Sequence, residues 1–144
     1  MVITKEIELD SVHALQNLYQ ELIDTPSDTS TFEAAFRRIK DDSQYILLGA
    51  FVDGELLGSL MGIVCHDLVG DCRPFMVIEN VVVSSRARRQ GVGKKLMLAI
   101  EEAARERDCY YIILVSGEKR KEAHIFYEAL GYREEQVEGY RKYI

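Results

Sequence analysis

A basic, glycine-containing turn between an apolar run and an amphipathic pattern constrains this chain more than any other feature. The run from Ile78 to Val83 is rich in β-branched residues, which is typical of a buried strand. Apolar residues at helical spacing begin at Val92. The segment from Arg86 to Lys95 carries five cations and no acid. This order predicts a strand, a tight turn, and a helix that begins inside a positively charged segment.

Such a helix start is suited to binding a polyanion. The first backbone N–H groups of a helix have no partner within it, and the helix dipole adds partial positive charge there. Gly91 and Gly93 stand at this point, and glycine lets a phosphate approach the backbone because it has no Cβ. Arginine and lysine add charge-assisted hydrogen bonds. On this segment alone, a glycine-rich helix start with solubilising cations is the alternative interpretation.

Two common phosphate-binding patterns do not match this turn. A Walker A loop requires Ser or Thr where Lys95 stands, and an earlier glycine where Arg88 stands. A dinucleotide-binding fingerprint requires a third glycine at the position of Leu96. Both classes of nucleotide site are therefore excluded by the spacing.

The remaining pattern, Arg88-x-x-Gly91-x-Gly93, resembles motif A of the GNAT superfamily of acyl-CoA-dependent N-acyltransferases. A second segment, Ala123 to Tyr132, resembles the C-terminal motif of the same superfamily, Ala-x-x-Phe-Tyr-x-x-x-Gly-Phe/Tyr. The two motifs stand in the order and spacing that this fold requires, and the resemblance covers essentially the whole chain.

The patterns along the chain predict a single α/β domain over residues 1–144, with elements in the order β-α-α-β-β-β-α-β-α-β-β. Its central sheet is expected to be mixed, antiparallel in the N-terminal part and parallel at the cofactor wedge, with about four flanking helices. The expected strands are Val2 to Leu9, Gln44 to Val52, Glu55 to Val64, Ile78 to Val83, Tyr110 to Val115, Tyr132 to Glu135 and Glu138 to Tyr143.

Local signals place several boundaries within this order. Asp53-Gly54 is the strongest hairpin signal in the chain. Asp10 or Ser11 is expected to cap the first helix, and Ser30 with Glu33 reads as a capping box that opens the second. The glycine-turn helix is expected to run to about Arg107. A last helix is expected from Glu118 or Lys119 to Gly131, which would end it as a left-handed glycine.

Composition narrows the location and the partners of the protein. The 144 residues carry a net charge of −6, which disfavours general nucleic-acid binding. The sequence has no apolar run of membrane-spanning length, and its acidic N-terminus has no signal-peptide form. Three cysteines without metal-type spacing fit reduced thiols. We therefore expect a soluble cytoplasmic protein with no metal, no nucleic-acid partner and no membrane partner.

The resemblance implies acetyl-CoA as the co-substrate and identifies the residues that would bind it. Backbone groups of the valine run would pair with the pantetheine arm, the amides of the glycine turn would hold the pyrophosphate, and Arg88 would lie beside it. Lys119, Arg120 or Lys121 would lie near the adenosine phosphate or simply form a solvated helix start, and many family members carry Asn where Arg120 stands. The expected cofactor-binding residues are Val81, Val82, Val83, Arg88, Arg89, Gln90, Gly91, Val92, Gly93, Lys94, Arg120 and Tyr127.

The same resemblance implies direct transfer of the acetyl group to a primary amine. Most amines are protonated at neutral pH, so a base must remove a proton, and Glu79 is the first candidate. The leaving thiolate needs a proton, and Tyr127 occupies the motif position for that acid. The structural alternatives are a strand-edge carboxylate for Glu79 and a core aromatic for Tyr127. His124 is a weaker candidate for a direct chemical role, and its alternative is a surface or supporting group. The Asn80 amide would hold a loop or the acceptor.

The acceptor is less constrained than the reaction. The first two helices, the loop between them, and the loops before the Ile78 strand and near the C-terminus would build its pocket. The acids of the first region either favour a cationic amine or serve as helix ends and turns: Asp24, Asp28, Asp41 and Asp42. The runs IENVVV and Cys109-Tyr110-Tyr111 resemble the hexosamine-phosphate N-acetyltransferase branch, whose C-terminal strands are shared across a dimer, so we expect a homodimer. A small-molecule amine is the expected acceptor; a protein or peptide acceptor and a non-catalytic acyl-CoA-binding module are the alternatives.

Overall fold

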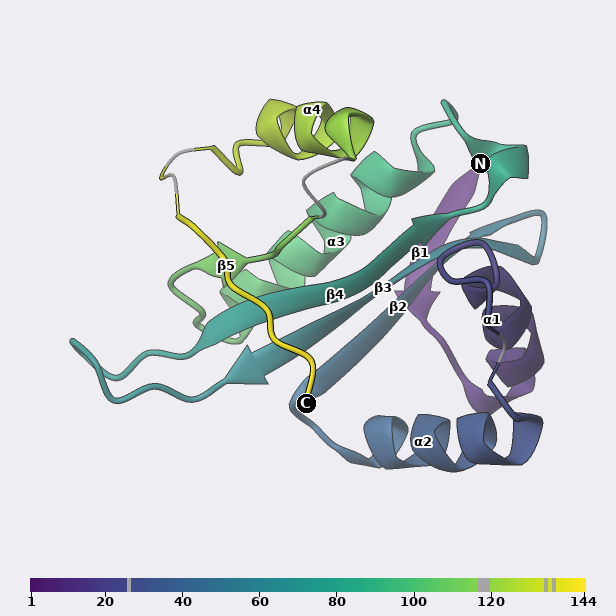
Figure 1. Cartoon of the computed structure of the whole chain (residues 1–144), viewed down its shortest axis with the longest axis horizontal. Coiled ribbons are helices and arrows are strands. Elements are labelled where there is room, and N and C mark those ends of the chain that lie inside the picture. The colour runs from purple at the N-terminus through teal and green to yellow at the C-terminus, as the bar shows by residue number, and fades with distance from the viewer. Residues whose placement is uncertain (26, 117–119, 134, 136) are drawn as a thin grey trace. The chain divides into compact units, whose positions relative to one another are not determined.

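The computed structural model describes all of residues 1–144 except 26, 117–119, 134 and 136 (Figure 1). The chain divides into two compact units, residues 1–113 and 114–144. The first unit holds a sheet and three of the described α-helices, and the second holds one described α-helix. Each unit is described by itself below.

The first unit is built on a five-stranded mixed sheet in which spatial order follows chain order (Figure 1). Neighbouring strands are antiparallel from β1 to β4, and β4 pairs with β5 in parallel. The predicted mixed sheet, antiparallel at first and parallel at its last pair, is confirmed. The strands are β1 (Val2–Glu6), β2 (Tyr45–Val52), β3 (Glu55–Cys65), β4 (Phe75–Val83) and β5 (Ile112–Ile113).

The hairpin between β2 and β3 turns at the predicted dipeptide. Asp53 and Gly54 have φ angles of 51° and 81°. Positive φ at both central positions is the geometry of a tight turn that matches the twist of the two strands. This hairpin sets the register of Val52 against Glu55.

One face of the sheet is covered by α3 (Val92–Glu106). Two glycines of β3 allow the helix to approach closely: a Cβ at Gly58 would lie 2.7 Å from Val92, and one at Gly62 would lie 2.7 Å from Ile100. A larger residue at either position would require Val92 or Ile100 of the helix to shift. The beginning of α3, where the glycine turn lies, is thereby held at a defined place above β3.

The opposite face is covered by α1 (Val12–Tyr19) and α2 (Thr29–Asp41). Two short 3₁₀ helices, η1 (Leu9–Ser11) and η2 (Ser85–Ala87), lie in the connections. Leu15 and Leu18 of α1 pack with Phe36 of α2 and with Val82 of β4 in one buried cluster. The packing places α1 beside the strand that carries the candidate site.

The predicted capping box at Ser30 is wrong. The helix begins at Thr29, and Asp28 is its N-cap, because the Asp28 carboxylate accepts a hydrogen bond from the Thr31 backbone N–H at 3.1 Å. Ser30 instead donates its hydroxyl hydrogen to the same carboxylate. Aspartate caps a helix as well as serine does, and Asp28 has the extended backbone that the cap position requires. Ser11 is the N-cap residue of α1, as predicted, but its side chain makes no cap hydrogen bond.

The second unit contains α4 (Lys121–Ala129), which ends as predicted. Gly131 has a φ of 96°, and the N–H groups of Gly131 and Tyr132 donate to the carbonyls of Glu128 and Tyr127. This pair of bonds is the Schellman arrangement that a left-handed glycine allows. The predicted helix starts, Glu118 and Lys119, lie outside the described residues.

The strands predicted after the glycine turn are shorter or not formed. The predicted strand Tyr110 to Val115 is reduced to Ile112–Ile113, and the described residues after Ile113 form no strand. The expected strands Tyr132 to Glu135 and Glu138 to Tyr143 are therefore wrong for the residues described. A strand needs a neighbouring backbone to complete its hydrogen bonds, and the C-terminal segment has local side-chain bonds instead, such as that from Tyr140 to Glu138. Among the described helices, none has the length and apolar character needed to cross a membrane.

Candidate functional site

A bulge interrupts β4 where the catalytic carboxylate was predicted. Ser59 of β3 pairs with Val82, and Met61 pairs with Glu79. Two residues of β4, Asn80 and its successor, therefore stand opposite a single residue of β3. Asn80 has a φ of 57°, in the left-handed region that asparagine tolerates better than most residues. Such a bulge bends the strand and redirects the side chains beside it.

Beyond its short pairing with β5, β4 presents an open backbone edge within the first unit. The parallel ladder ends where Val77 pairs with Ile113, while β4 continues to Val83. Within residues 1–113, no strand pairs with this last part of β4 on that side. Val82 is buried in the core, and its neighbours Val81 and Val83 are half-buried. An unpaired edge of this kind can accept an extended ligand through main-chain hydrogen bonds.

The predicted glycine turn has the backbone geometry of an anion site. Arg89 and Gly91 have φ angles of 67° and 77°, and Gly91 is the N-cap of α3. The first helical bond of α3 runs from the Lys95 N–H to the Gly91 carbonyl at 3.0 Å. The N–H groups of the first turn therefore point out of the helix without an intrahelical partner. A Cβ at Gly91 would meet nothing within 4 Å, so the space above this glycine is open.

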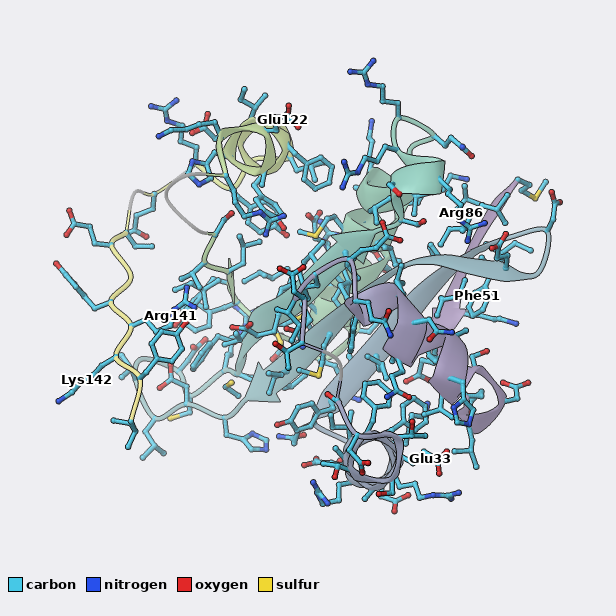
Figure 2. The ribbon with its side chains drawn as sticks, turned by 45° about the vertical axis from the view of Figure 1, so that its right-hand side comes forward. Glu33, Phe51, Arg86, Glu122, Arg141 and Lys142 are labelled. Atoms are coloured by element: carbon cyan, nitrogen blue, oxygen red, sulfur yellow. The ribbon has the colours of Figure 1, made fainter. Side chains whose placement is uncertain are left out.

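The five cations around the turn do not all serve the same purpose. The Arg86 guanidinium is paired with the Glu55 carboxylate at the start of β3, and this hydrogen bond raises the pKa of Arg86. Figure 2 labels Arg86 on the segment that precedes the glycine turn. The other cations of the turn are exposed: Arg88, Arg89, Lys94 and Lys95. Four cations therefore remain in positions accessible to an anionic ligand.

A contact that the sequence did not suggest ties α1 to the segment before the turn. The Glu21 carboxylate, just beyond the end of α1, accepts a hydrogen bond from the Ser85 backbone N–H at 2.8 Å. This bond, together with the charge of Arg88, lowers the pKa of Glu21. The contact joins residues 64 positions apart. The bond therefore holds the segment before the glycine turn against the end of α1.

A pocket of about 130 Å³ lies between α1, the loop that follows it, α2 and the β4 bulge. Among the described residues, its lining contains hydrogen-bonding and apolar side chains but no charged one. The lining residues are Gln16, Tyr19, Gln20, Leu22, Ile23, Thr25, Ser27, Phe32 and Asn80. The first two helices and their loop therefore form a pocket where the acceptor was expected.

The acids predicted to make this region negative are used in local structure instead. Asp28 caps α2, and Asp42 accepts a hydrogen bond from the Gln44 N–H at 2.9 Å just after α2 ends. Neither residue lines the pocket, and neither do Asp24 and Asp41. The alternative interpretation, in which these acids serve helix ends and turns, is confirmed for Asp28 and Asp42.

Glu79 immediately precedes the bulge residue that lines the pocket. Its side chain is exposed, as is that of Asn80. An exposed carboxylate at this position keeps its access to water. The predicted base is thus adjacent in sequence to a residue that lines the candidate acceptor pocket.

Tyr127 and Arg120 both belong to the second unit. Tyr127 lies on α4, is 8% exposed, and packs edge-on against Phe126 and Tyr132 with ring centroids 5.2 and 6.3 Å apart. Burial raises the pKa of Tyr127, and the charge of Arg120 opposes that rise. Arg120 is exposed and is the N-cap residue of α4. Its backbone carbonyl accepts a hydrogen bond from the backbone N–H of His124, whose side chain is half-buried. Lys121 is the first helical residue, and Lys119 lies outside the described residues.

Other chemistries find little support in the described part of the chain. Among the described residues, His, Cys, Asp and Glu side chains form no group of three or more suited to a metal ion. Burial raises the pKa of the Cys109 thiol, and a raised pKa lowers the fraction of reactive thiolate. Cys109 therefore has the properties of a packed thiol.

A family model and a curated relative that match this chain both describe acetyltransferases. Residues 10–132 match the family model described as the acetyltransferase (GNAT) family. A curated relative, glucosamine 6-phosphate N-acetyltransferase from Trypanosoma brucei brucei, is 36% identical over 80 residues, which cover 56% of this chain and 52% of that protein. The match thus spans about half the length of that relative.

Solved structures match over nearly the entire chain. A structure described as a transcriptional regulator from Bacillus halodurans has a TM-score of 0.93 and 26% identity, and the match covers 100% of both chains. A putative acetyltransferase from Agrobacterium tumefaciens has a TM-score of 0.91 and 22% identity, and the match covers 98% of this chain and 99% of the other.

Proposed function

The chain belongs to the GNAT family of acetyltransferases, and we propose that it transfers an acetyl group from acetyl-CoA to a primary amine of a small molecule. The observation that carries this proposal is that three features lie along β4 or directly after it. They are an open edge up to Val83, a bulge at Asn80 that lines a pocket, and the glycine turn that follows the strand. The edge and the turn suit an acyl-CoA, and the bulge suits its acceptor. The family match spans both compact units, which supports one acetyltransferase domain over residues 1–144.

In this proposal the first unit binds the body of acetyl-CoA. The backbone from Val81 to Val83 pairs with the pantetheine arm as a further strand would. The N–H groups from Arg89 through Gln90, Gly91, Val92 and Gly93 to Lys94 bind the pyrophosphate, with support from the exposed Arg88. The left-handed backbone at Arg89 and Gly91 supports this assignment, because such a turn directs successive N–H groups to one side. Arg120 is proposed for the adenosine end.

The amine then attacks the thioester carbonyl directly. A C–N bond forms as the C–S bond breaks, so the amine must lose a proton and the thiolate must gain one. Glu79 takes the proton from the amine, directly or through water. Tyr127 gives its hydroxyl proton to the departing thiolate, and it is suited to this because burial keeps it protonated.

Replacing Glu79 by glutamine is expected to lower kcat about 100-fold or more at neutral pH, the usual range for a lost general base. The defect should shrink as the pH rises, because an increasing fraction of the amine acceptor is then already deprotonated. Steady-state rates over a pH series measure this trend. A matched control is Glu6→Gln, which removes an exposed carboxylate from β1, away from the glycine turn and the pocket lining. A defect that stays constant with pH would assign Glu79 a structural role.

The small pocket favours a small-molecule acceptor over a peptide. A peptide needs an extended groove, whereas the pocket at Asn80 has a volume of about 130 Å³. The curated relative is named for an amino-sugar phosphate, which makes amino sugars the first acceptors to test. The third candidate, a non-catalytic acyl-CoA-binding module, is kept because a protein described as a transcriptional regulator shares the fold.

The test is release of free thiol from acetyl-CoA in the presence of single amines. The panel contains glucosamine, glucosamine 6-phosphate, neamine, spermidine and short peptides. The proposal expects one small-molecule class to exceed the rate of hydrolysis without acceptor. A peptide that exceeds every small amine would favour the second candidate. No turnover together with tight acetyl-CoA binding would favour the third.

A homodimer is proposed on the exposed apolar side chains of the C-terminal segment. Val137, Tyr140 and Tyr143 are 62%, 89% and 83% exposed, and Figure 2 shows the adjacent Arg141 and Lys142 on this extended segment. An extended segment with apolar side chains can gain a partner by pairing with a second copy. Sedimentation of the intact chain at two concentrations tests this, and a monomer at both would reject it.

A cytoplasmic location is proposed on the state of the cysteines. Cys65, Cys72 and Cys109 are free thiols in the structure, and free thiols persist in a reducing compartment. Fractionation of the native cells with an antibody to the chain tests this location, and recovery in an oxidising compartment would reject it.

A further inference from the structure

One hydrogen bond joins two residues of the pocket lining across the loop that follows α1. The side-chain nitrogen Nε2 of Gln16 donates to the backbone carbonyl of Ser27 at 2.8 Å. Gln16 lies within α1, and Ser27 directly precedes Asp28, the N-cap of α2. Both bonded residues line the pocket proposed for the acceptor. The bond therefore holds the far end of the loop, and with it one wall of the pocket, against α1.

The beginning of this loop is held by different contacts. The backbone N–H groups of Leu22 and Ile23 donate to the Tyr19 carbonyl at 2.9 and 3.1 Å. Leu22 and Ile23 also line the pocket. These bonds continue the end of α1 and fix the first part of the loop, whereas the Gln16 bond fixes the part that contains Ser27.

The bond from Gln16 also determines which atoms of its amide remain for an occupant of the pocket. A backbone carbonyl can only accept a hydrogen bond, so the amide atom that faces Ser27 is the nitrogen. One N–H of this nitrogen and the carbonyl oxygen Oε1 remain. Among the described residues, none donates a hydrogen bond to Oε1. The amide thus presents an acceptor and a donor in an orientation that Ser27 holds.

The part of the acceptor that meets this amide follows from the proposed chemistry. Glu79 is the proposed base and adjoins Asn80 at the β4 bulge, so the reacting amine belongs at that side of the pocket. Gln16 enters the lining from α1 and is therefore placed to contact a different group of the same molecule. A hydroxyl fits best, because it can donate to Oε1 and accept from the remaining N–H.

We propose that Gln16 is a specificity-determining residue for the acceptor: its amide, held by Ser27, binds a hydroxyl group that stands beside the reacting amine. The inference rests on the proposed function, because it assigns this pocket to the acceptor. It names the substrate class as amino alcohols, which include amino sugars, and it places simple alkyl amines at a disadvantage. A small uncharged hydroxyl group also matches a pocket of about 130 Å³ whose described lining carries no charge.

The principal test compares two amines that differ in one hydroxyl, trans-2-aminocyclohexanol and cyclohexylamine. Their dissociation constants are measured by NMR titration of the intact chain with coenzyme A present. The wild type should bind the amino alcohol about five- to tenfold more tightly, the value of one neutral hydrogen bond. Gln16→Met keeps the length of the side chain and removes both amide functions, so this preference should fall below about twofold. A wild type without the preference would reject the proposal.

Gln44→Met is the matched control for this change. Gln44 and Gln16 are both half-buried, and the Gln44 side-chain nitrogen lies 2.7 Å from a ring nitrogen of His66. Gln44 lies outside the pocket lining. The control therefore removes a comparable amide contact away from the acceptor and should keep the wild-type preference. Loss of the preference in both variants would overturn the proposal.

A second variant, Gln16→Glu, tests the part played by the Ser27 bond. Glutamate keeps an accepting oxygen but has no N–H with which to hold the Ser27 carbonyl. The preference for the amino alcohol should therefore stay below the wild-type value. Full preference in Gln16→Glu would reject the role of the Ser27 bond in specificity.

The binding test distinguishes this inference from the proposed function. If Gln16 carries the preference but no amine of the panel is acetylated, the proposed function fails and the specificity role stands. If amines are acetylated while Gln16→Met weakens the binding of both cyclohexyl amines equally, the proposed function stands and the specificity role is rejected. With turnover, Gln16→Met should raise the KM for the amino alcohol about five- to tenfold and change kcat less than about twofold.

Discussion

Replacing Gly91 by valine is expected to weaken acetyl-CoA binding by at least about 100-fold. Gly91 has a φ of 77°, which a β-branched residue adopts only with strain of about 1–2 kcal/mol or more. The new side chain would also fill the open space above the turn, where the pyrophosphate is proposed to bind. Loss of two charge-assisted hydrogen bonds, each worth about 1.5–3 kcal/mol, is enough to account for this factor. Isothermal titration with acetyl-CoA measures it.

Gly54→Val provides a matched control for this change. Gly54 has a φ of 81° in the β2–β3 turn, and a Cβ there would also meet nothing within 4 Å. The control therefore introduces the same backbone strain without touching the glycine turn. Both variants should lose a similar amount of stability, whereas only Gly91→Val should lose acetyl-CoA. Equal affinities for the two variants would contradict the phosphate-binding role of the turn.

Replacing Tyr127 by phenylalanine is expected to lower kcat about 100-fold or more, the usual range for a lost general acid. The ring contacts with Phe126 and Tyr132 should survive, because only the hydroxyl oxygen is removed. The dissociation constant for acetyl-CoA should therefore change less than about twofold, within the scatter of surface substitutions. Single-turnover transfer rates together with equilibrium titration measure the two effects separately.

The pH dependence gives a second test of Tyr127. The acid must be protonated to act, and burial raises its pKa above the ordinary value of 10.0. The acid-competent form thus persists through neutral pH and is lost only as the pH rises through this raised pKa. Wild-type kcat should therefore show no loss assignable to Tyr127 at neutral pH. Tyr140→Phe, a change at an exposed tyrosine of the same unit, should leave kcat unchanged; equal loss of kcat and affinity in Tyr127→Phe would assign the residue to packing.

The elements that could be predicted from the sequence are those specified by local chemistry. Asp53-Gly54 predicts a tight hairpin because both positions tolerate positive φ, and Gly131 ends α4 for the same reason. The glycine turn was found because Gly91 and the cations stand directly between a β-branched run and a helical pattern. In each case a few adjacent residues contain the whole signal.

The features that were missed depend on partners far away in the chain. The bulge at Asn80 follows from the register between β3 and β4, which no local pattern reveals, although an asparagine inside a valine-rich strand was a signal for a left-handed residue. Asp28 replaced Ser30 as a cap because several nearby side chains can serve, and only their geometry decides.

The predicted C-terminal strands are not formed by the described residues, for a related reason. An alternating segment predicts a strand only if a neighbouring backbone is available, and the described residues from Val137 to Ile144 have none within their own unit. The proposed dimer would supply such a neighbour. Residue patterns specify which structure a segment can form, and a strand forms only where a neighbouring backbone is available to pair with it.

The most direct measurement is the parallel assay of thiol release and acetylated amine, with acetyl-CoA and the amine panel in turn. The proposed function predicts that one small-molecule amine, with amino sugars as the first expectation, yields one acetylated product for each thiol released, and that both signals fall together in Tyr127→Phe. Thiol release without acetylated amine would mean simple hydrolysis. Tight binding of acetyl-CoA with neither product, across the whole panel, would contradict the assignment of this chain as a small-molecule N-acetyltransferase.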